Sequence, residues 1–278
     1  MLPFSKKFRK IWTTVIIAGY VAFGMLFLQI PDQKFHIYFL DIGQGDSILI
    51  KTPENHQILI DGGPGNTVIE ELGEVLPFFD KSIDLVVLTH PHADHVDGLI
   101  EVLKRFNVNN VLITGVSYDS PDYKEFLNEI EKKNINVLVA ESRTDFRFGN
   151  VLFDIIYPKN SIAGKKFPNV NNSSITMRVL YKNKKILLTG DLESEAEQKL
   201  ILTGINLKAD IFKAGHHGSK TASSMDLLRK VNPTFTVIQS GAGNSFGHPH
   251  KETLENFKKI GVKKVFRNDL QGRIEFIF

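Results

Sequence analysis

The sequence predicts an α/β fold in which two β-sheets pack face to face, with helices on both outer surfaces, preceded by one N-terminal transmembrane helix. Three observations support this prediction. Short strand-like runs alternate with helical segments along residues 34–278, both halves of that region contain consecutive strands without a helix between them, and residues 11–30 are almost entirely apolar. We therefore expect a basic N-terminus and membrane anchor at residues 1–33 and a globular domain at residues 34–278.

The N-terminal segment differs sharply from the rest of the chain. Four basic residues lie between positions 6 and 10, and the apolar run 11–30 follows them. Twenty helical residues rise roughly 30 Å, the thickness of a bilayer's hydrocarbon core. The basic cluster predicts a cytoplasmic N-terminus and a single-pass protein of the cell membrane, with its domain outside the cytoplasm. A signal peptide cleaved after Ala22-Phe23-Gly24 is the alternative, although it would leave an apolar new terminus at Met25.

The composition excludes several kinds of chemistry. No cysteine is present, which removes disulfides, thiolate metal ligands and cysteine nucleophiles. The net charge of +3 comes from the N-terminal segment, because residues 34–278 hold 30 basic and 30 acidic residues. This balance gives no support to DNA binding through bulk positive charge. A local basic groove, to which Lys165 and Lys166 could contribute, stays open.

The first half of the domain begins with three consecutive strands and then alternates helices and strands. Turn-forming residues at 41–46 and 52–56 separate the first three strands, and Ser120-Pro121 is a typical helix start. In order, we expect strands at Phe35–Leu40, Ser47–Lys51 and Gln57–Ile60, a helix at Val68–Phe79, a strand at Ile83–Leu88, a helix from Val96, a strand at Asn110–Thr114, a helix at Tyr123–Lys133 and a strand at Asn136–Ala140.

The second half begins with a run of strands and ends with alternating elements. Apolar, β-branched strands in both halves indicate sheets that are buried against each other. In order, we expect strands at Val151–Tyr157, Ile175–Tyr181 and Lys185–Leu188, a helix at Glu193–Leu202, a strand at Asp210–Lys213, a helix at Ser223–Val231, a strand at Thr234–Gln239, a helix at Lys251–Lys259 and strands at Lys264–Phe266 and Arg273–Phe278.

The densest polar motif of the chain follows the strand expected at Ile83–Leu88. It places three imidazoles and a carboxylate within six positions, at His90, His92, Asp94 and His95. Neutral imidazole nitrogens and carboxylates are the ligands of zinc-like divalent ions. Three of the chain's nine histidines in so short a run make a chance polar loop a poor interpretation. A strand-to-helix turn here could direct the first two histidines to one ion and Asp94 and His95 to another.

Further polar residues follow predicted strands or precede a predicted helix. They are Asp61, Asp191, the pair His216 and His217, and the pair His248 and His250. Side chains at strand ends meet along one edge of a sheet sandwich, so a single cleft could collect all of them.

The order of these motifs resembles the metallo-β-lactamase superfamily over roughly residues 35–278. Within it, the runs Phe39–Ser47, Gly215–Ser219 and Gly247–His250 resemble the extracytoplasmic hydrolase domain of the ComEC family of DNA-internalization competence proteins. The resemblance implies a four-layer αββα sandwich and a metal-dependent hydrolase. ComEC proteins are polytopic membrane proteins with a channel-forming region, whereas one predicted span here indicates a stand-alone relative of the hydrolase domain.

The resemblance also implies a role for each motif residue. His90 and His92 would hold a first metal ion, and Asp191 would bridge it to a second. The second ion would be held by Asp94, His95 and one of His216 or His217. We favour His217, because a His-Gly dipeptide is frequent at this position of the superfamily and His217-Gly218 matches it.

Asp61 would orient the histidine motif by hydrogen bonds from outside the ligand set, a role with a measurable effect on metal affinity. A simple turn residue is the alternative for both Asp61 and Asp191. One departure from the superfamily concerns the first ion: this chain has no histidine between His95 and His216, and Asn171–Ser174 occupies the corresponding stretch. We therefore expect one or two divalent ions, Zn²⁺ or Mn²⁺, with a weak or open first site.

Catalytic roles follow from the same comparison. Asp94 or Asp191 would orient the attacking water, and His216 or His248 would protonate the leaving oxygen. Phosphate oxygens of the substrate would be positioned by Asn172, Ser174, Ser219 and His248. For His248, capping or packing at the helix start is the alternative role. Asp46 is expected mainly to shape the turn after the first strand, in a loop that could border the cleft.

Three functions are compatible with this site. The first is a membrane-anchored, metal-dependent phosphodiesterase that acts outside the cytoplasm, with single-stranded DNA as its expected substrate and competence membrane proteins as candidate partners. The second is a hydrolase of small esters or phosphocholine-type diesters, which the neutral domain favours equally. The third is a non-catalytic, metal-stabilised module that binds DNA or a partner.

Overall fold

A computed structural model describes residues 6–27, 32–142 and 144–278. The chain divides into two compact units, Met1–Gln33 and Lys34–Phe278. In the described part of the first unit, helix α1 (Lys6–Phe27) is followed by residues outside the description.

Helix α1 covers most of the segment for which a membrane anchor is predicted. Among the described residues, no helix combines the length and the apolar character needed to cross a membrane. The basic residues between positions 6 and 10 occupy the first turns of α1. The last three residues of the predicted span, 28–30, lie outside the described part of the chain.

The second unit contains two seven-stranded sheets among the described residues. The first sheet has the order β14 (Ile274–Ile277), β1 (His36–Phe39), β2 (Ile48–Lys51), β3 (Gln57–Ile60), β4 (Ser82–Val87), β5 (Asn107–Ile113) and β6 (Asn136–Val139). The second has the order β13 (Lys264–Arg267), β12 (Phe235–Ile238), β11 (Ile211–Lys213), β10 (Lys184–Leu188), β9 (Thr176–Tyr181), β8 (Val151–Tyr157) and β7 (Phe146–Phe148).

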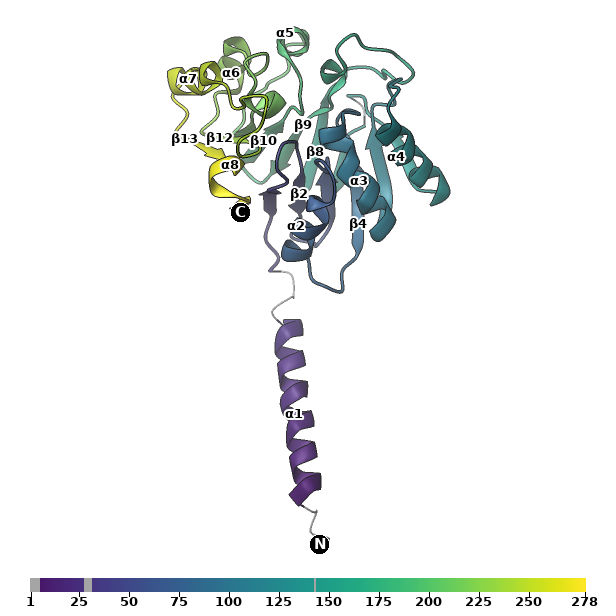
Figure 1. The fold of residues 1–278 in the computed structure, drawn as a ribbon. Coiled ribbons are helices and arrows are strands. Elements are labelled where there is room, and N and C mark those ends of the chain that lie inside the picture. The colour runs from purple at the N-terminus through teal and green to yellow at the C-terminus, as the bar shows by residue number, and fades with distance from the viewer. Residues whose placement is uncertain (1–5, 28–31, 143) are drawn as a thin grey trace. The chain divides into compact units, whose positions relative to one another are not determined.

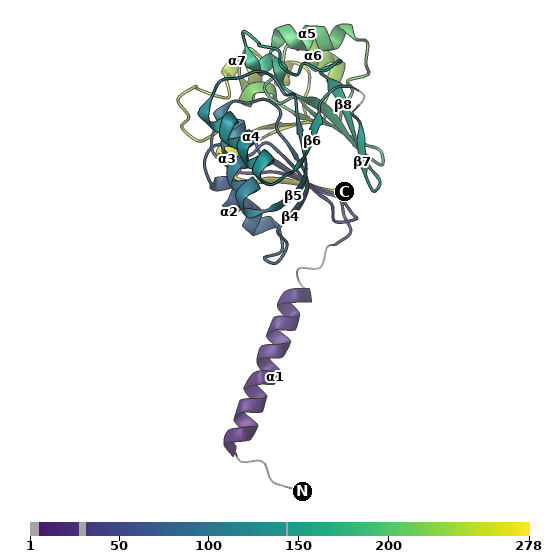
Figure 2. The same cartoon turned by 90° about the vertical axis from the view of Figure 1, so that its right-hand side faces the viewer.

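Helices cover the outer face of each sheet (Figures 1 and 2). The first sheet is covered by α2 (Thr67–Val75), α3 (Ala93–Arg105) and α4 (Pro121–Lys132), and the second by α5 (Ser194–Leu202), α6 (Met225–Val231) and α7 (Lys251–Lys259). The predicted two-sheet α/β sandwich with outer helices is confirmed. The short elements α8 (Asn268–Gln271), β7 and the 3₁₀ turns Val170–Ser173 and Gly215–Gly218 were not predicted.

Three apolar layers hold the four layers of secondary structure together. Between the sheets lie residues such as Phe39, Phe153 and Ile186, all with 0% exposure. A second layer joins the first sheet to its helices, and a third joins the second sheet to its own. Burial on this scale is the main favourable contribution to the free energy of folding.

The largest error in the predicted boundaries is at α2. The helix expected at Val68–Phe79 ends at Val75, and Leu76 has an extended backbone. Proline disfavours helical geometry in the residue before it, and Pro77 follows Leu76. Phe78 and Phe79 consequently lie in an exposed loop.

The parallel strands fix where the functional side chains emerge. β3, β4 and β5 run parallel in the first sheet, as do β10, β11 and β12 in the second. Asp61 directly follows β3, Asp191 follows β10 by three residues, and His216 and His217 follow β11. The carboxyl ends of both sheets therefore deliver these residues to one edge of the sandwich, as the strand-end argument predicts.

Candidate metal centre

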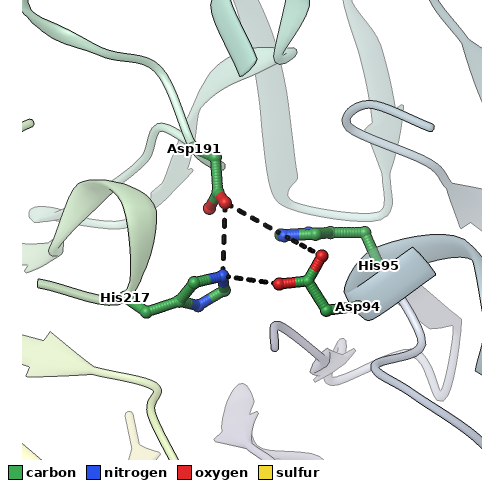
Figure 3. Close-up of side chains that lie close together, drawn as sticks. All are labelled: Asp94, His95, Asp191 and His217. Atoms are coloured by element: carbon green, nitrogen blue, oxygen red, sulfur yellow. Dashed lines mark hydrogen bonds and ion pairs between the residues drawn. The ribbon is translucent and has the colours of Figure 1, made fainter. Parts of the chain in front are cut away.

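Four side chains from three segments of the chain converge at this edge (Figure 3). Their ligand atoms, from Asp94, His95, Asp191 and His217, all lie within 4.8 Å of one another. Asp191 Oδ2 is central, at 3.2 Å from both His95 Nε2 and His217 Nε2. Asp94 Oδ2 lies 3.1 Å from His217 Nε2. His95, Asp191 and His217 are buried, whereas the Asp94 side chain is one-third exposed and faces the opening of the site.

Helix α3 begins earlier in the chain than predicted, so the second part of the His90–His95 motif lies in the helix and not in a turn. His92 is the N-cap residue, and Asp94 and His95 lie in the first helical turn. The helix is fixed against the end of β3 by two backbone hydrogen bonds, from Gly62 N to His95 O and from Gly98 N to Gly63 O, each 2.8 Å. Any side chain at Gly62 or Gly98 would collide with the backbone of the other segment. This close approach sets the position of His95.

Asp61 holds His95 from the side opposite the cluster. Its Oδ2 accepts a hydrogen bond of 2.9 Å from His95 Nδ1 and one of 2.7 Å from the Thr89 hydroxyl, and its Oδ1 accepts from Thr89 N at 2.8 Å. Nδ1 carries the proton that this carboxylate accepts, so when the other ring proton is lost the lone pair of Nε2 faces the cluster. Asp61 thereby fixes both the ring and its tautomer.

Replacing Asp61 by asparagine is therefore expected to weaken binding of the divalent ion about 10- to 100-fold, because an amide has one acceptor oxygen for the two donors Thr89 N and His95 Nδ1 and carries no negative charge. Titration calorimetry with Zn²⁺ and with Mn²⁺ measures this. The matched control is Asp226→Asn, a change of charge at a side chain that is 61% exposed on α6. An unchanged affinity in a folded Asp61→Asn variant would show that Asp61 serves the turn alone.

A second buried carboxylate, Asp46, lies behind His217 as an ion-pair partner, while the hydrogen bond of His217 Nδ1 is to the carbonyl oxygen of Gln239. Its Oδ1 lies 3.1 Å from His217 Nδ1, which also lies 3.1 Å from the carbonyl oxygen of Gln239. Asp46 Oδ2 forms an ion pair with Lys213, and both side chains are buried. Lys213 Nζ is also 4.0 Å from Asp191 Oδ1. The sequence interpretation assigned Asp46 mainly to the turn and gave Lys213 no role; their burial together beside the cluster is what reveals them.

The two histidines after β11 have an unusual backbone. His216 and His217 both have left-handed torsion angles, with φ of 47° and 53°. This conformation costs roughly 1–2 kcal/mol per non-glycine residue, so the surrounding contacts must impose it. Gly215 N donates to the Ser223 hydroxyl, and Ser223 N donates to the buried Glu197 carboxylate of α5. The strained turn directs the His217 ring inward and leaves His216 partly exposed.

A pair of imidazoles, His90 and His92, lies beside the main cluster. His90 Nε2 and His92 Nδ1 face each other at 3.1 Å, and Asp191 Oδ2 lies 3.9 Å from His90 Nε2. Burial holds the pKa of both imidazoles below the usual range, so both are neutral near pH 7. Across the described residues, the compact groups of imidazoles and carboxylates do not include these two rings. The geometry therefore places two imidazoles at the predicted first site and four candidate ligand residues at the second.

Electrostatics at the main cluster favour a positive charge. Burial alone would lower the pKa of His95, but Asp191 and Asp61 hold it well above the usual range. Burial would also lower the pKa of His217, but Asp191 and Asp46 raise it by more, so this pKa too lies well above the usual range. The pKa of Asp191 is well below its usual range because the two imidazoles exceed the effect of burial. So many carboxylates around two imidazoles attract either protons or a divalent cation.

The donor set fits a divalent metal ion. His95 and His217 each have Nδ1 directed to a carboxylate behind the ring and Nε2 directed to Asp191, the arrangement usual for metal-ligating histidines. His95 Nε2 and Asp191 Oδ1 are buried and have no hydrogen-bond partner among the described residues. Asp94, His95, Asp191 and His217 would hold one ion, and His90 with His92 would hold a second beside Asp191. The metal identity stays a prediction.

The other predicted site residues lie around this centre and differ in what their side chains contact. Ser174 Oγ is buried and accepts a hydrogen bond from Asp191 N, and Asn172 Oδ1 accepts one from Glu193 N. In the structure these two groups therefore support the Asp191 segment. Ser219 Oγ lies 3.0 Å from the Thr221 hydroxyl. Their roles in binding phosphate remain predictions.

His216 and His248 lie at the mouth of the site. His216 Nδ1 is 3.0 Å from Glu193 Oε1, and its ring centroid is 5.5 Å from that of His248. Glu193 is held in place by the side-chain amides of Asn169 and Asn171. Burial and the nearby imidazoles lower the pKa of His248 to about 4, so this ring is neutral at pH 7. The predictions had not included Glu193.

Comparison with known proteins agrees with the fold and the motifs. The chain is 28% identical to the ComE operon protein 3 of Bacillus subtilis, over 85% of this chain and 32% of that protein. It is 28% identical to the competence protein ComA of Neisseria gonorrhoeae, over 95% of this chain and 35% of that protein. The chain thus spans about a third of these relatives' length. The predicted resemblance to competence proteins of the ComEC type is confirmed.

Solved structures share the architecture at low sequence identity. The metallo-beta-lactamase fold protein YhfI of Bacillus subtilis matches with a TM-score of 0.57 and 11% identity, over 88% of this chain and all of that one. Igni18, a metallo hydrolase of Ignicoccus hospitalis, matches with a TM-score of 0.54 and 15% identity, over 87% and 99% of the two chains. The family model of the metallo-beta-lactamase superfamily matches residues 40–241. The chain belongs to the metallo-beta-lactamase superfamily of metal-dependent hydrolases.

Proposed function

We propose that this protein is a metal-dependent phosphodiesterase that cleaves DNA, with single-stranded DNA as its substrate. The observation that carries the proposal is the buried cluster of Asp94, His95, Asp191 and His217, in which each histidine has its own supporting carboxylate. The names of its relatives, which include competence proteins, support DNA as the substrate.

Bound divalent ions would lower the pKa of water and stabilise negative charge that develops on the phosphate. The side chains around them have separate tasks. Asp94 is one-third exposed at the mouth of the site, so its carboxylate can accept a hydrogen bond from the attacking water and orient it. Asp191 is buried and held by the hydroxyl of Ser174, so it fixes the relative positions of the two imidazoles.

The leaving oxygen needs a proton donor, and His216 is placed to be one. Its side chain is 25% exposed, and Glu193 holds Nδ1, which leaves Nε2 turned toward the cluster at 3.9 Å from Asp191 Oδ2. An imidazole held by a carboxylate on one nitrogen can donate from the other. His248 stands beside it as a neutral ring and could accept a hydrogen bond from the substrate.

Cleavage of single-stranded DNA by the purified full chain tests the proposal. The protein is stripped of metal, and activity is measured before and after Mn²⁺ or Zn²⁺ is returned. Cutting that appears only with the metal and is absent in Asp191→Asn supports the phosphodiesterase. A folded protein that binds metal but cuts neither DNA nor any small diester would favour a non-catalytic, metal-stabilised binding module.

We further propose that the N-terminal segment anchors the protein in the cell membrane, with the hydrolase unit outside the cytoplasm and competence membrane proteins as partners. The basic residues between positions 6 and 10, followed by the apolar run that begins at Ile11, support this orientation. Cell fractionation followed by protease treatment of intact spheroplasts tests it. Recovery of the full chain in the soluble fraction would contradict the anchor.

A second candidate function is hydrolysis of small esters or phosphocholine-type diesters. The equal numbers of acidic and basic residues in 34–278 favour it, because a polyanionic substrate gains little from an overall neutral domain. Turnover of small diesters compared with oligonucleotides, at matched metal content, separates the two. A kcat/KM at least tenfold higher on the small diester would favour this candidate over the nuclease.

A further inference from the structure

An exposed aromatic ring lies beside the metal centre and takes no part in it. Phe246, in the loop between β12 and α7, is 63% exposed. Its ring lies 5.7 Å from the ring of His248, and the two planes differ by only 22°. His248 lies 5.5 Å from His216 and 6.1 Å from His217. A row of rings thus leads from the cluster to a phenyl group at the surface.

The side chain of Asn244 makes four hydrogen bonds within the loop that carries Phe246. Asn244 Oδ1 accepts hydrogen bonds from Phe246 N at 3.2 Å and from His248 N at 3.0 Å. Asn244 Nδ2 donates to the carbonyl oxygens of Gly241 and His248. The exposed ring is therefore presented by an ordered backbone, which reduces the entropy lost when a ligand stacks on it.

A second aromatic residue lies on the other border of the site. The ring of Tyr118 is 5.7 Å from that of His92, edge to face, and the residue is half-buried. Aromatic side chains on which successive bases stack are one means by which single-stranded nucleic acids are bound without sequence preference.

We infer that Phe246 is a stacking platform for a nucleobase that flanks the scissile phosphodiester. The inference rests on the proposed function and extends it to a base-binding subsite. It explains how a domain with no net charge would hold a polynucleotide, because stacking depends on the flat face of a base and not on bulk positive charge. The ring is too exposed to contribute much to the core, so its removal leaves the fold intact.

Binding of two labelled oligomers to the full chain tests the inference. One is an oligothymidylate of about twelve nucleotides, and the other is an abasic deoxyribose-phosphate chain of the same length. Fluorescence anisotropy is expected to show that Phe246→Ala weakens binding of the oligothymidylate about tenfold and leaves the abasic chain unchanged. Phe246→Trp should restore binding. The matched control is Phe78→Ala, which removes another exposed ring, 67% accessible, from the loop after α2.

Equal losses on both oligomers would mean that Phe246 shapes the loop, and no loss on either would mean that it binds nothing; either result overturns the inference. Because the assay measures binding without turnover, it stands apart from the test of hydrolysis. A protein that binds through Phe246 but cleaves no diester contradicts the proposed function alone. One that cleaves DNA and is insensitive to Phe246→Ala contradicts the stacking platform alone.

Discussion

Replacement of Asp191 by asparagine is expected to lower metal-dependent cleavage by at least about a thousandfold. Asparagine has nearly the same shape, so the hydrogen bond from its backbone N–H to Ser174 can remain. What is lost is the negative charge 3.2 Å from both His95 Nε2 and His217 Nε2, which holds the two imidazoles to a shared cation. The variant should also bind fewer equivalents of metal, as measured by atomic absorption after dialysis.

The exposed-site variant Asp226→Asn, which makes the same chemical change at an exposed side chain of α6, should keep full activity and metal content. Circular dichroism and the unfolding midpoint establish that the Asp191→Asn protein is folded. A folded variant that retains the metal and more than about a tenth of the wild-type rate would remove Asp191 from the ligand set.

Replacement of Asp46 by asparagine is expected to destabilise the protein by about 3–5 kcal/mol at pH 7. Lys213 is buried, and its ammonium group would lose its nearest negative charge, with the carbonyl of Gly190 at 3.4 Å and Asp191 at 4.0 Å remaining nearby. A buried charge that loses its partner carries its desolvation cost without compensation. Urea unfolding measures the loss in the free energy of unfolding. The double change Asp46→Asn with Lys213→Met removes the unpaired charge and should recover part of that loss.

The dependence of this effect on pH has a definite sign. Burial alone would raise the pKa of Asp46. The nearby charges of Lys213 and His217 have a larger, opposite effect, so the pKa lies below its ordinary value of 3.8. A carboxylate of this kind stabilises the fold above pH 3.8 and loses that contribution as the pH falls through its lowered pKa.

The control for the unfolding of Asp46→Asn is Glu195→Gln, which breaks an exposed pair with Lys199 and should lower the free energy of unfolding by less than about 1 kcal/mol. A comparable cost in both variants would contradict the argument.

The motif His90 to His95 could be located from sequence because its chemistry is local. Ligand residues are contiguous there, and the strand before them and the helix after them have clear periodicities. The strand at Gln57–Ile60 and the helix at Lys251–Lys259 were predicted to the residue. The structure places His217 in the compact cluster, and the assignment of His217 as the ligand in preference to His216, which came from the resemblance, stays a prediction.

Long-range pairing explains what the sequence did not reveal. Asp46 follows a glycine-rich turn and has the character of a turn residue, and its partner Lys213 lies on a strand of the other sheet. No local pattern links the two. A lysine near the end of an apolar strand, Ile211–Lys213, was the available signal, because a charge that cannot reach solvent needs a buried partner. The hydrogen bonds of Ser174 and Asn172 to the backbone of Asp191 and Glu193 also join distant parts of the chain, while their role in binding phosphate stays a prediction.

The contact between Gly62 and Gly98 lies in a part of the site that tolerates few substitutions, whereas the rim of the site tolerates many. Neither position has room for a side chain. A substitution at either one would displace α3, so the base of the site should stay constant during evolution. The rim at Phe246 and at Lys165 and Lys166 has no such constraint, since these side chains are exposed. Variation in substrate range should therefore accumulate at the rim, and a mutagenesis library aimed at new substrates is best confined there, with the two glycines kept fixed.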